Sequence, residues 1–257
     1  VKGATAKVVW STRVGPVPKK KPPRNSADWI GGCPSAPPAV CDDLIFGSLT
    51  YPRTVFALDR KTGREVWRQE GVNGERGLST DGKTVWAAED RQGLWALDAR
   101  TGKRIWHWGG SDKNHYNMFG TAENPPVVAH GLLLVWANRN FMAVHAKTGN
   151  EAWRAGDSMG GPGCGGPTAA GRHIYAVNVA GEGYNRPKGV KYGGGHYLYA
   201  IDPKTGKPVW KHHVGLGKSC GQPAIAYGRL YVPTSGGEVF CFEPVPADYK
   251  NEPQAPP

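Results

Sequence analysis

The sequence predicts an all-β fold built from repeated four-stranded antiparallel units. Three observations carry this prediction. An eleven-residue pattern, Ala-x-Asp-x-x-Thr-Gly-x-x-x-Trp, recurs along the chain with its tryptophan always at the same position. The 37 glycines, 22 prolines and 10 tryptophans are typical of many tight turns between strands. No segment shows the apolar periodicity of a long helix.

The repeat has a constant internal spacing and connections of variable length. Its copies run over 57–67, 96–106, 143–153 and 200–210. The third copy has His145 in place of the aspartate, where a neutral imidazole can make similar hydrogen bonds. Successive tryptophans lie 39, 47 and 57 residues apart, so each copy is one unit of a repeated architecture with loops of different length.

Each copy predicts a strand, a tight turn and a second strand. In the first copy, apolar residues at 55–58 form a strand, and Gly63 reverses the chain because glycine adopts positive φ. The carboxylate of Asp59 is expected to accept hydrogen bonds from amides of the turn. On the second strand, Trp67 is expected to pack against the neighbouring unit over the small side chain of Ala57.

Two more strands precede each copy, which makes four strands per unit. One is apolar, as at 44–46, and the other often begins with proline, as at 38–40. Four antiparallel strands per repeated unit predict the blades of a β-propeller. We expect a single propeller over residues 1–243 and a Pro-rich C-terminal tail over residues 244–257.

The two ends of the propeller region carry complementary halves of the repeat. Residues 5–10 end in Trp10 and match its second half, whereas residues 241–243 match its first half. We therefore expect five blades closed by the N-terminal strand, so that no sheet edge stays open. A fragment of a seven- or eight-bladed ring and a partner chain that supplies the remainder are the alternatives.

These residues resemble the PQQ-like repeat family, whose tryptophan-docking motif occurs in quinoprotein alcohol dehydrogenases and in the non-enzymatic assembly lipoprotein BamB. The resemblance covers residues 1–10 and 34–243. It implies a structural docking role for five tryptophans: Trp10, Trp67, Trp106, Trp153 and Trp210. Enzymes of the family hold pyrroloquinoline quinone (PQQ) between a tryptophan and a ring made by two adjacent cysteines, beside a calcium ion. This chain has no adjacent cysteines and is too short for their eight blades, so the resemblance implies architecture alone.

Three of the five cysteines precede predicted inner strands at related positions: Cys33, Cys164 and Cys220. One hypothesis is a thiolate cluster around the central channel, joined by Met118 or His115, that binds a soft metal or a haem. The alternatives are a disulfide between neighbouring blades, a local pair of Cys33 with Cys41, or small side chains that fill a narrow funnel. Cys241 takes the alanine position of the repeat, which packing explains.

The chain carries 32 basic and 21 acidic residues, and its formal net charge of +11 favours acidic partners. The dense cluster is Lys19, Lys20 and Lys21, within a Pro-rich segment at 11–32 that predicts an extended arm. This arm is either a solvated tether or a partner-binding element. Nucleic-acid binding is not predicted, because no aromatic-lined basic groove or recognition helix accompanies the lysines.

Two connections, at 107–119 and 181–196, are longer than a turn requires. Loops on a rigid scaffold are common binding sites, and these two combine aromatic with basic residues. They predict a partner-binding surface that includes His115, Tyr116, Tyr184, Arg186 and Tyr192. Solvated extensions are the alternative. The glycine-rich stretches do not precede a helix, as a phosphate-binding loop would require.

The sequence favours a non-catalytic propeller over an enzyme. It contains no Gly-x-Ser-x-Gly elbow and no run of about 20 apolar residues, which argues against hydrolase chemistry and against a membrane-spanning helix. We expect an interaction scaffold or accessory subunit of an extracytoplasmic complex, periplasmic or extracellular, with protein partners. A membrane-associated complex is compatible with this role. The alternative is a small redox protein that holds PQQ, a metal or a haem in the channel.

Overall fold

The computed structural model describes residues 7–15, 36–50, 52–89, 93–109, 125–137, 140–155, 165–179, 196–214, 221–234 and 237–243. Within these residues every regular element is a β-strand, and nineteen strands form five antiparallel sheets. The same part of the chain contains no helix long and apolar enough to cross a membrane.

The first two sheets have four strands each, and the strands follow one another in chain order. The first sheet consists of β1 (Ala39–Cys41), β2 (Leu44–Leu49), β3 (Thr54–Asp59) and β4 (Glu65–Glu70). The second sheet consists of β5 (Gly77–Thr80), β6 (Thr84–Glu89), β7 (Gly93–Asp98) and β8 (Arg104–Trp108).

The next two sheets repeat this order, and the last one has three strands. The third sheet consists of β9 (Val127–Ala129), β10 (Leu132–Ala137), β11 (Asn140–His145) and β12 (Glu151–Arg154). The fourth sheet consists of β13 (Thr168–Ala170), β14 (His173–Val179), β15 (His196–Ile201) and β16 (Pro208–His213). The fifth sheet consists of β17 (Ala224–Ala226), β18 (Arg229–Pro233) and β19 (Val239–Phe242).

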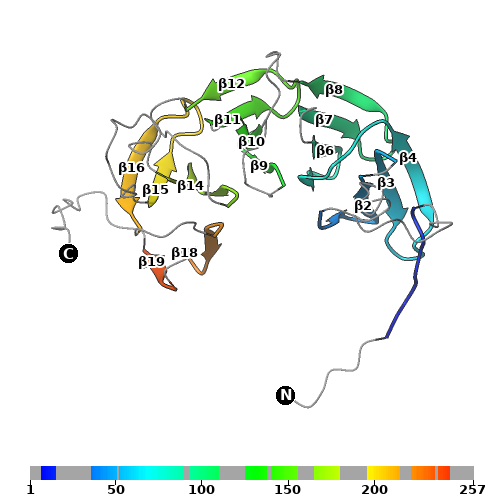
Figure 1. Cartoon of the computed structure of the whole chain (residues 1–257), viewed down its shortest axis with the longest axis horizontal. Coiled ribbons are helices and arrows are strands. Elements are labelled where there is room, and N and C mark those ends of the chain that lie inside the picture. The colour runs from blue at the N-terminus through cyan, green and yellow to red at the C-terminus, as the bar shows by residue number, and fades with distance from the viewer. Residues whose placement is uncertain are drawn as a thin grey trace, which may run out of the picture.

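The sheets follow one another along an arc, with the first strand of each sheet inside and the fourth strand on the outer rim (Figure 1). Neighbouring inner strands touch, as β1 does with β5, β5 with β9, and β13 with β17. This is the arrangement of propeller blades. The prediction of an all-β propeller with four-stranded antiparallel blades is confirmed.

The apolar core is divided among the seams between blades. At the first seam, Phe46 and Val55 of one blade pack against Val85 and Leu97 of the next. Three further clusters lie at the following seams, so the second, third and fourth blades each bury both of their faces. This explains the uninterrupted apolar runs of the central strands, such as 55–58, because both sides of such a strand are covered.

A register shift occurs at the repeat alanine in four blades. Ala57 lies opposite Trp67, whereas the next residue, Leu58, lies opposite Glu65, which leaves Val66 as an extra residue of β4. The same shift follows the repeat alanine of the second, third and fourth blades, after Ala96, Ala143 and Ala200. A β-bulge bends its strand and increases its twist, so the repeat specifies a bent outer strand as well as a turn.

The connections divide between two faces of the arc. Connections that leave odd-numbered strands contain at most six residues, as at 202–207, and we call their side the turn face. Connections that leave even-numbered strands emerge on the opposite side, which we call the loop face, because neighbouring strands are antiparallel. All four connections longer than six residues join strand ends on the loop face: 109–126, 155–167, 180–195 and 214–223.

The arc is open between its first and last blades (Figure 1). In the described residues β19 is the last strand of the fifth blade, and residues 7–15 form no strand of that sheet but lie against the first blade. The expected pairing of the N-terminal strand with the last blade is therefore not present in the described residues. Closure by that strand within one chain stays a prediction.

Candidate functional site

The repeat residues meet at the outer edge of the first three seams. Trp67 lies against Gly102 of the next blade and donates its indole N–H to the carbonyl of Ala99 at 2.9 Å. Gly102 has a φ of 71°, and a side chain at this position would collide with the indole. The contact recurs at two further seams, where Trp106 meets Gly149 and the carbonyl of Ala146, and Trp153 meets Gly206 and the carbonyl of Pro203.

The N-terminal segment, residues 7–15, makes the same contact with the first blade. Trp10 lies against Gly63 and donates its indole N–H to the carbonyl of Arg60 at 3.0 Å. Thr12 adds a hydrogen bond from its hydroxyl to the carbonyl of Gly63 at 2.6 Å. The segment therefore occupies the place that the outer strand of a preceding blade would take.

The same segment also covers an apolar cluster of the first blade. Trp10 and Val14 pack against this cluster, which consists of Leu49, Phe56 and Leu58. Arg68 donates a hydrogen bond to the carbonyl of Val14 at 2.9 Å. In contrast, Val8 and Val9 are 79% and 81% exposed. The segment is thus held at one end and presents a bare apolar pair at the other.

The repeat aspartate organises each turn as the sequence predicts for Asp59. Its Oδ1 accepts hydrogen bonds from the amides of Lys61 and Thr62, at 3.0 and 2.7 Å, and from the Thr62 hydroxyl at 2.7 Å. In the second blade, Asp98 accepts the equivalent bonds from Arg100 and Thr101. These bonds lower the pKa of both carboxyl groups, with the threonine hydroxyl as the largest cause.

The third blade keeps the turn without the carboxylate. His145 is exposed, and its backbone carbonyl accepts a hydrogen bond from the amide of Gly149 at 2.8 Å. The equivalent backbone bond occurs in the first blade, from the Gly63 amide to the Asp59 carbonyl. The backbone and the glycine therefore define the turn, and the aspartate adds to it.

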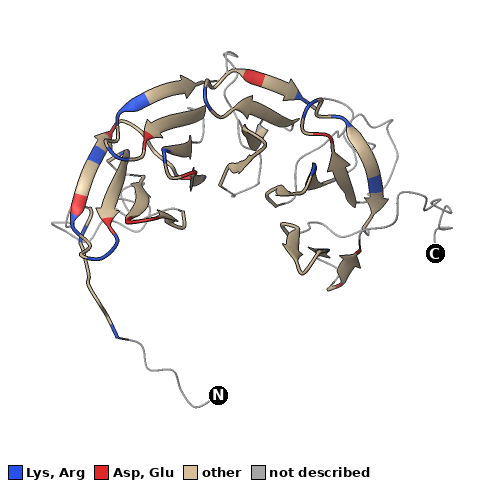
Figure 2. Cartoon of the chain, turned by 180° about the vertical axis from the view of Figure 1, so that it is seen from behind, with Lys and Arg blue, Asp and Glu red and all other residues tan. Residues whose placement is uncertain are grey.

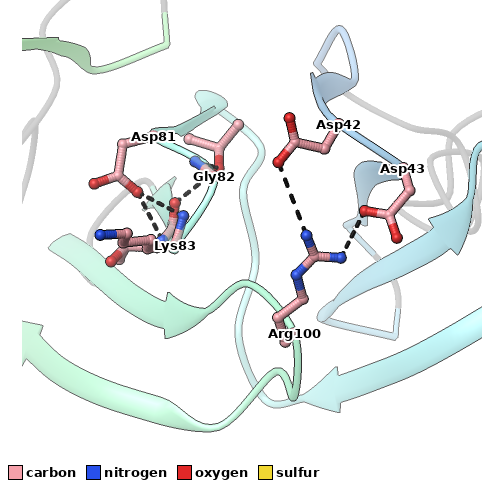
Figure 3. Close-up of polar contacts among 8 residues, drawn as sticks. Asp42, Asp43, Asp81, Gly82, Lys83 and Arg100 are labelled. Atoms are coloured by element: carbon pink, nitrogen blue, oxygen red, sulfur yellow. Dashed lines mark hydrogen bonds and ion pairs between the residues drawn. The ribbon is translucent and has the colours of Figure 1, made fainter.

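An ion-pair cluster joins the first two blades on the turn face (Figure 3). Arg100 Nη1 lies 2.5 Å from Asp43 Oδ1, and Nη2 lies 3.8 Å from Asp42 Oδ2. The hydrogen bond to Asp43 raises the pKa of Arg100 and lowers that of Asp43. All three side chains are exposed, so water and salt weaken the pair, which is a small contribution to the seam.

A second cross-blade cluster lies at the loop-face end of the same seam. Arg53 Nη2 of the first blade lies 2.6 Å from Oε1 of Glu89, whose side chain is almost fully buried in the second blade. Trp95 donates its indole N–H to Glu89 Oε2 at 3.1 Å, and its ring stacks on His107 at 3.7 Å. The guanidinium of Arg104 lies 5.0 Å from the Trp95 ring. The buried carboxylate of Glu89 thus fixes the Trp95 ring, and this ring in turn contacts His107 and Arg104.

The last blade has an aromatic cluster on its inner seam and an unpaired outer edge. Trp210 and His212 of β16 face Phe242 of β19 at centroid distances of 5.6 and 5.1 Å. Burial among these rings, and the neighbouring His213, lower the pKa of His212. In the described residues β19 pairs with β18 alone, and Val239 at this edge is 65% exposed.

Most residues predicted to bind lie outside the described part of the chain. They are the channel cysteines Cys33, Cys164 and Cys220, the arm lysines Lys19, Lys20 and Lys21, and the loop residues His115, Tyr116, Tyr184, Arg186 and Tyr192. Cys41 is a free thiol, and burial raises its pKa. Cys241 is also free and is exposed at the repeat alanine position.

The described residues do not supply the donor set of the quinoprotein cofactor site. Among them, no three His, Cys, Asp or Glu side chains come together in a way that could hold a metal ion. The full sequence contains no adjacent cysteine pair. The described residues therefore do not fit a PQQ or metal site of the quinoprotein type.

Charged residues of both signs are interspersed over the described outer strands and turns (Figure 2). On β4, for example, Glu65 and Arg68 pair at 2.5 Å, and on β12 Glu151 and Arg154 pair at 2.8 Å. On these two strands, charges of opposite sign therefore pair locally.

Sequence reasoning did not find the two cross-blade clusters or the bulge. The ion pair of Arg53 with Glu89 belongs to the first seam, and the other copies of the repeat have no equivalent pair of residues. A contact that belongs to one seam has no periodic signal. The bulge does recur, and its signal is the bulky, exposed residue before the tryptophan, as in Val66, Ile105 and Val209.

The blades, their tryptophan contacts and the repeat define a β-propeller of the PQQ-like repeat class. The chain belongs to the family described as outer membrane protein assembly factor BamB, whose model matches residues 1–117 and 142–245. This confirms the resemblance that the repeat indicates.

Two curated relatives are serine/threonine-protein kinases named AfsK. The one from Streptomyces coelicolor is 29% identical over 115 residues, which is 45% of this chain and 14% of the kinase. The one from Streptomyces griseus is 28% identical over 193 residues, which is 60% of this chain and 23% of the kinase. The chain thus spans less than a quarter of the length of these relatives.

Solved structures with a similar fold include a quinohemoprotein alcohol dehydrogenase from Comamonas testosteroni, with a TM-score of 0.55 and 18% identity over 83% of this chain and 43% of that one. A europium-containing methanol dehydrogenase has a TM-score of 0.54 and 19% identity over 79% of this chain and 49% of that one. BamB from Moraxella catarrhalis has a TM-score of 0.49 and 14% identity over 82% of this chain and 77% of that one. At these identities the likeness to the two dehydrogenases shows the fold alone.

Proposed function

We propose that this chain is a non-catalytic interaction scaffold, an accessory subunit of an extracytoplasmic complex in the periplasm or at the cell surface. The observation that carries the proposal is the division between the two faces. The repeat residues form rigid seams, and every connection longer than six residues joins strand ends on the loop face. A rigid scaffold with its variable loops on one side is a common arrangement for binding.

The family supports a role in an assembly. Its description names a factor that assembles outer membrane proteins, and such a factor acts together with other proteins. The kinase relatives support a modular role, because the matched stretch is a minor part of each kinase. This chain itself contains neither the His-Arg-Asp nor the Asp-Phe-Gly triplet of protein kinases.

We further propose that the arm lysines bind an acidic surface of the partner. Lys19, Lys20 and Lys21 concentrate positive charge in a chain whose net charge is +11. In this proposal the arm is the segment 11–32, and hydrogen bonds of Thr12 and Val14 attach its first residues to the first blade.

The experiment is affinity capture from an extracytoplasmic fraction with the tagged chain and a triple variant, Lys19→Ala, Lys20→Ala and Lys21→Ala. The matched control removes three exposed turn-face lysines, by Lys61→Ala, Lys103→Ala and Lys147→Ala. We expect one stoichiometric partner, lost in the arm variant and kept in the control. Equal loss in both variants would assign the effect to net charge, and no specific partner at all would remove the scaffold proposal.

The redox alternative is tested on the same preparation. A scaffold predicts no stoichiometric visible chromophore and no stoichiometric metal in the protein purified from its native source. PQQ and haem both absorb in the visible range, and elemental analysis detects a metal. A chromophore or metal at one equivalent per chain would overturn the non-catalytic assignment.

A further inference from the structure

In the described residues the fifth blade is incomplete, because it has no fourth strand beside β19. In the other four sheets the third strand pairs with a fourth strand that carries the seam tryptophan. In the fifth sheet the third strand is β19, which pairs with β18 alone in the described residues. Val239 on this strand is 65% exposed. The unpaired edge of a β-strand is a template on which one more strand can pair.

The N-terminal segment has the sequence of a fourth strand. Val8-Val9-Trp10 corresponds to Glu65-Val66-Trp67 and to Pro208-Val209-Trp210 in complete blades. Its Trp10 already makes the contact of an outer-strand tryptophan, with Gly63 and the carbonyl of Arg60. The segment nevertheless lies in no sheet, and its Val8 and Val9 remain exposed.

The register of the missing pairing follows from the complete blades. Because Ala57 lies opposite Trp67, and Val55 opposite Gln69, β19 should place Cys241 opposite Trp10 and Val239 opposite Thr12. The bulge falls at Val9, the position of the exposed Val66 and Val209. This pairing brings the backbone of the segment onto the outer edge of the last blade.

We propose that the β19 edge of one chain binds residues 7–12 of a second copy of the chain. Within one chain the two surfaces lie at opposite ends of an open arc (Figure 1). The repeated tryptophan contacts set the angle between successive blades, so bending the arc shut would disturb several seams at once. Strand donation by a second copy needs no such change.

The donated strand also fixes how the two copies meet. Because Trp10 of the donor stays on Gly63 of its own first blade, that blade follows the acceptor's fifth blade as any blade follows its predecessor. The contact is head-to-tail, since each copy donates one surface and accepts at another. This assembly is independent of the scaffold role, and its failure would leave the partner-capture experiment unaffected.

The test is disulfide trapping between two single variants, Thr12→Cys and Val239→Cys, in a chain whose five native cysteines, which include the exposed Cys241, are replaced by serine. Directly opposed residues in a sheet have Cβ atoms about 4.5–5.5 Å apart, and a disulfide needs about 3.5–4.5 Å, so a small movement of the strands brings the two thiols within bonding distance. When the two variants are mixed and oxidised, we expect a covalent dimer, about tenfold or more above either variant alone. The control replaces Val239→Cys by Val209→Cys, because Val209 is similarly exposed but lies on the fourth strand of a four-stranded blade.

The double variant separates the two sources of the strand. A second copy predicts linked dimers and larger species from Thr12→Cys/Val239→Cys. A linked monomer together with no dimer in the mixture would show that a chain closes on its own strand and would overturn the proposal. Absence of any link between these positions would overturn it too.

A charge at the edge gives an independent measurement. Val239→Lys places an ammonium where the strand must dock, and edge lysines oppose strand addition. We expect the wild type to associate with rising concentration in sedimentation velocity, Val239→Lys to remain monomeric, and Val209→Lys to associate like the wild type. A wild type that is monomeric at every concentration would contradict the proposal.

Discussion

At the scale of the residue, the seam depends on a glycine that has no room for a side chain. Gly102 and Gly131 have nearly the same conformation, with φ of 71° and 74°. A Cβ on Gly102 would lie 2.5 Å from Cε3 of Trp67, whereas a Cβ on Gly131 would have no atom within 4 Å. A substitution at Gly131 therefore tests backbone strain alone, whereas a substitution at Gly102 tests strain together with a collision with the indole.

The first prediction compares Gly102→Ala with Gly131→Ala. Both changes place alanine at positive φ, which costs about 1 kcal/mol. Gly102→Ala also displaces the Trp67 ring, and overpacking of this kind costs about 1–3 kcal/mol more. The free energy of unfolding in urea measures both. Equal losses would show that the indole moves without cost.

The second prediction concerns the turn carboxylate Asp98. Because its pKa is lowered in the folded protein, it stabilises the fold above the ordinary pKa of aspartate, and this stability is lost as the pH falls through the folded pKa. Thr101→Val removes the largest cause, so we expect the pKa of Asp98 to rise toward its ordinary value in an NMR titration. Thr148→Val, in the turn where His145 replaces the aspartate, should leave the acid dependence of unfolding unchanged.

At the scale of the element, the outer strand joins one blade to the next. It pairs with its own blade through a bulge and places its tryptophan on the turn of the following blade, as Trp67 does. The repeat thus contributes to two blades at once. An outer strand without its tryptophan would keep the backbone pairing with its own blade and lose the contact with the following blade.

The third prediction is that Trp67→Ala destabilises the propeller by about 3–5 kcal/mol, because a nearly buried indole leaves a cavity at the seam. Trp67→Phe keeps a ring and loses the hydrogen bond to the Ala99 carbonyl, so it should cost less. Chemical unfolding of both variants measures the difference. A loss under about 1 kcal/mol for Trp67→Ala would contradict the wedge role of the indole.

At the scale of the whole molecule, stability passes from blade to blade through neighbouring seams. Each cluster of buried residues contains side chains from two adjacent blades, and the N-terminal segment adds one more cluster at the first blade. Architectures of this type derive their stability from units and nearest-neighbour interfaces. A change at one seam should therefore weaken that seam before it affects the others.

The fourth prediction tests the link between the first two blades on the loop face. Arg53→Met leaves Glu89 buried without its ion pair and should cost about 1–3 kcal/mol. Arg53→Met combined with Glu89→Met removes the unpaired charge and should recover part of this loss. Urea unfolding of the single and double variants checks it, and additive losses would show that the two side chains do not interact.

The sequence by itself determined the blade. Glycine at positive φ, a carboxylate over a turn and a tryptophan four residues after the glycine are local features, so the pattern from Ala57 to Trp67 was sufficient to predict strand, turn and seam residue. Repetition then made the fold class readable, because identical units have few ways to bury their faces other than by packing on one another.

Only the tertiary structure decided how the blades are joined and where the arc is open. Arg53 with Glu89, and Arg100 with Asp43, join different blades at separations that no repeat encodes. The half-copies at the two ends match in sequence, yet in the described residues the N-terminal segment lies in no sheet and β19 pairs with β18 alone. Local pattern specifies what a strand can pair with, whereas the angles summed over all seams decide whether the two surfaces of one chain can meet.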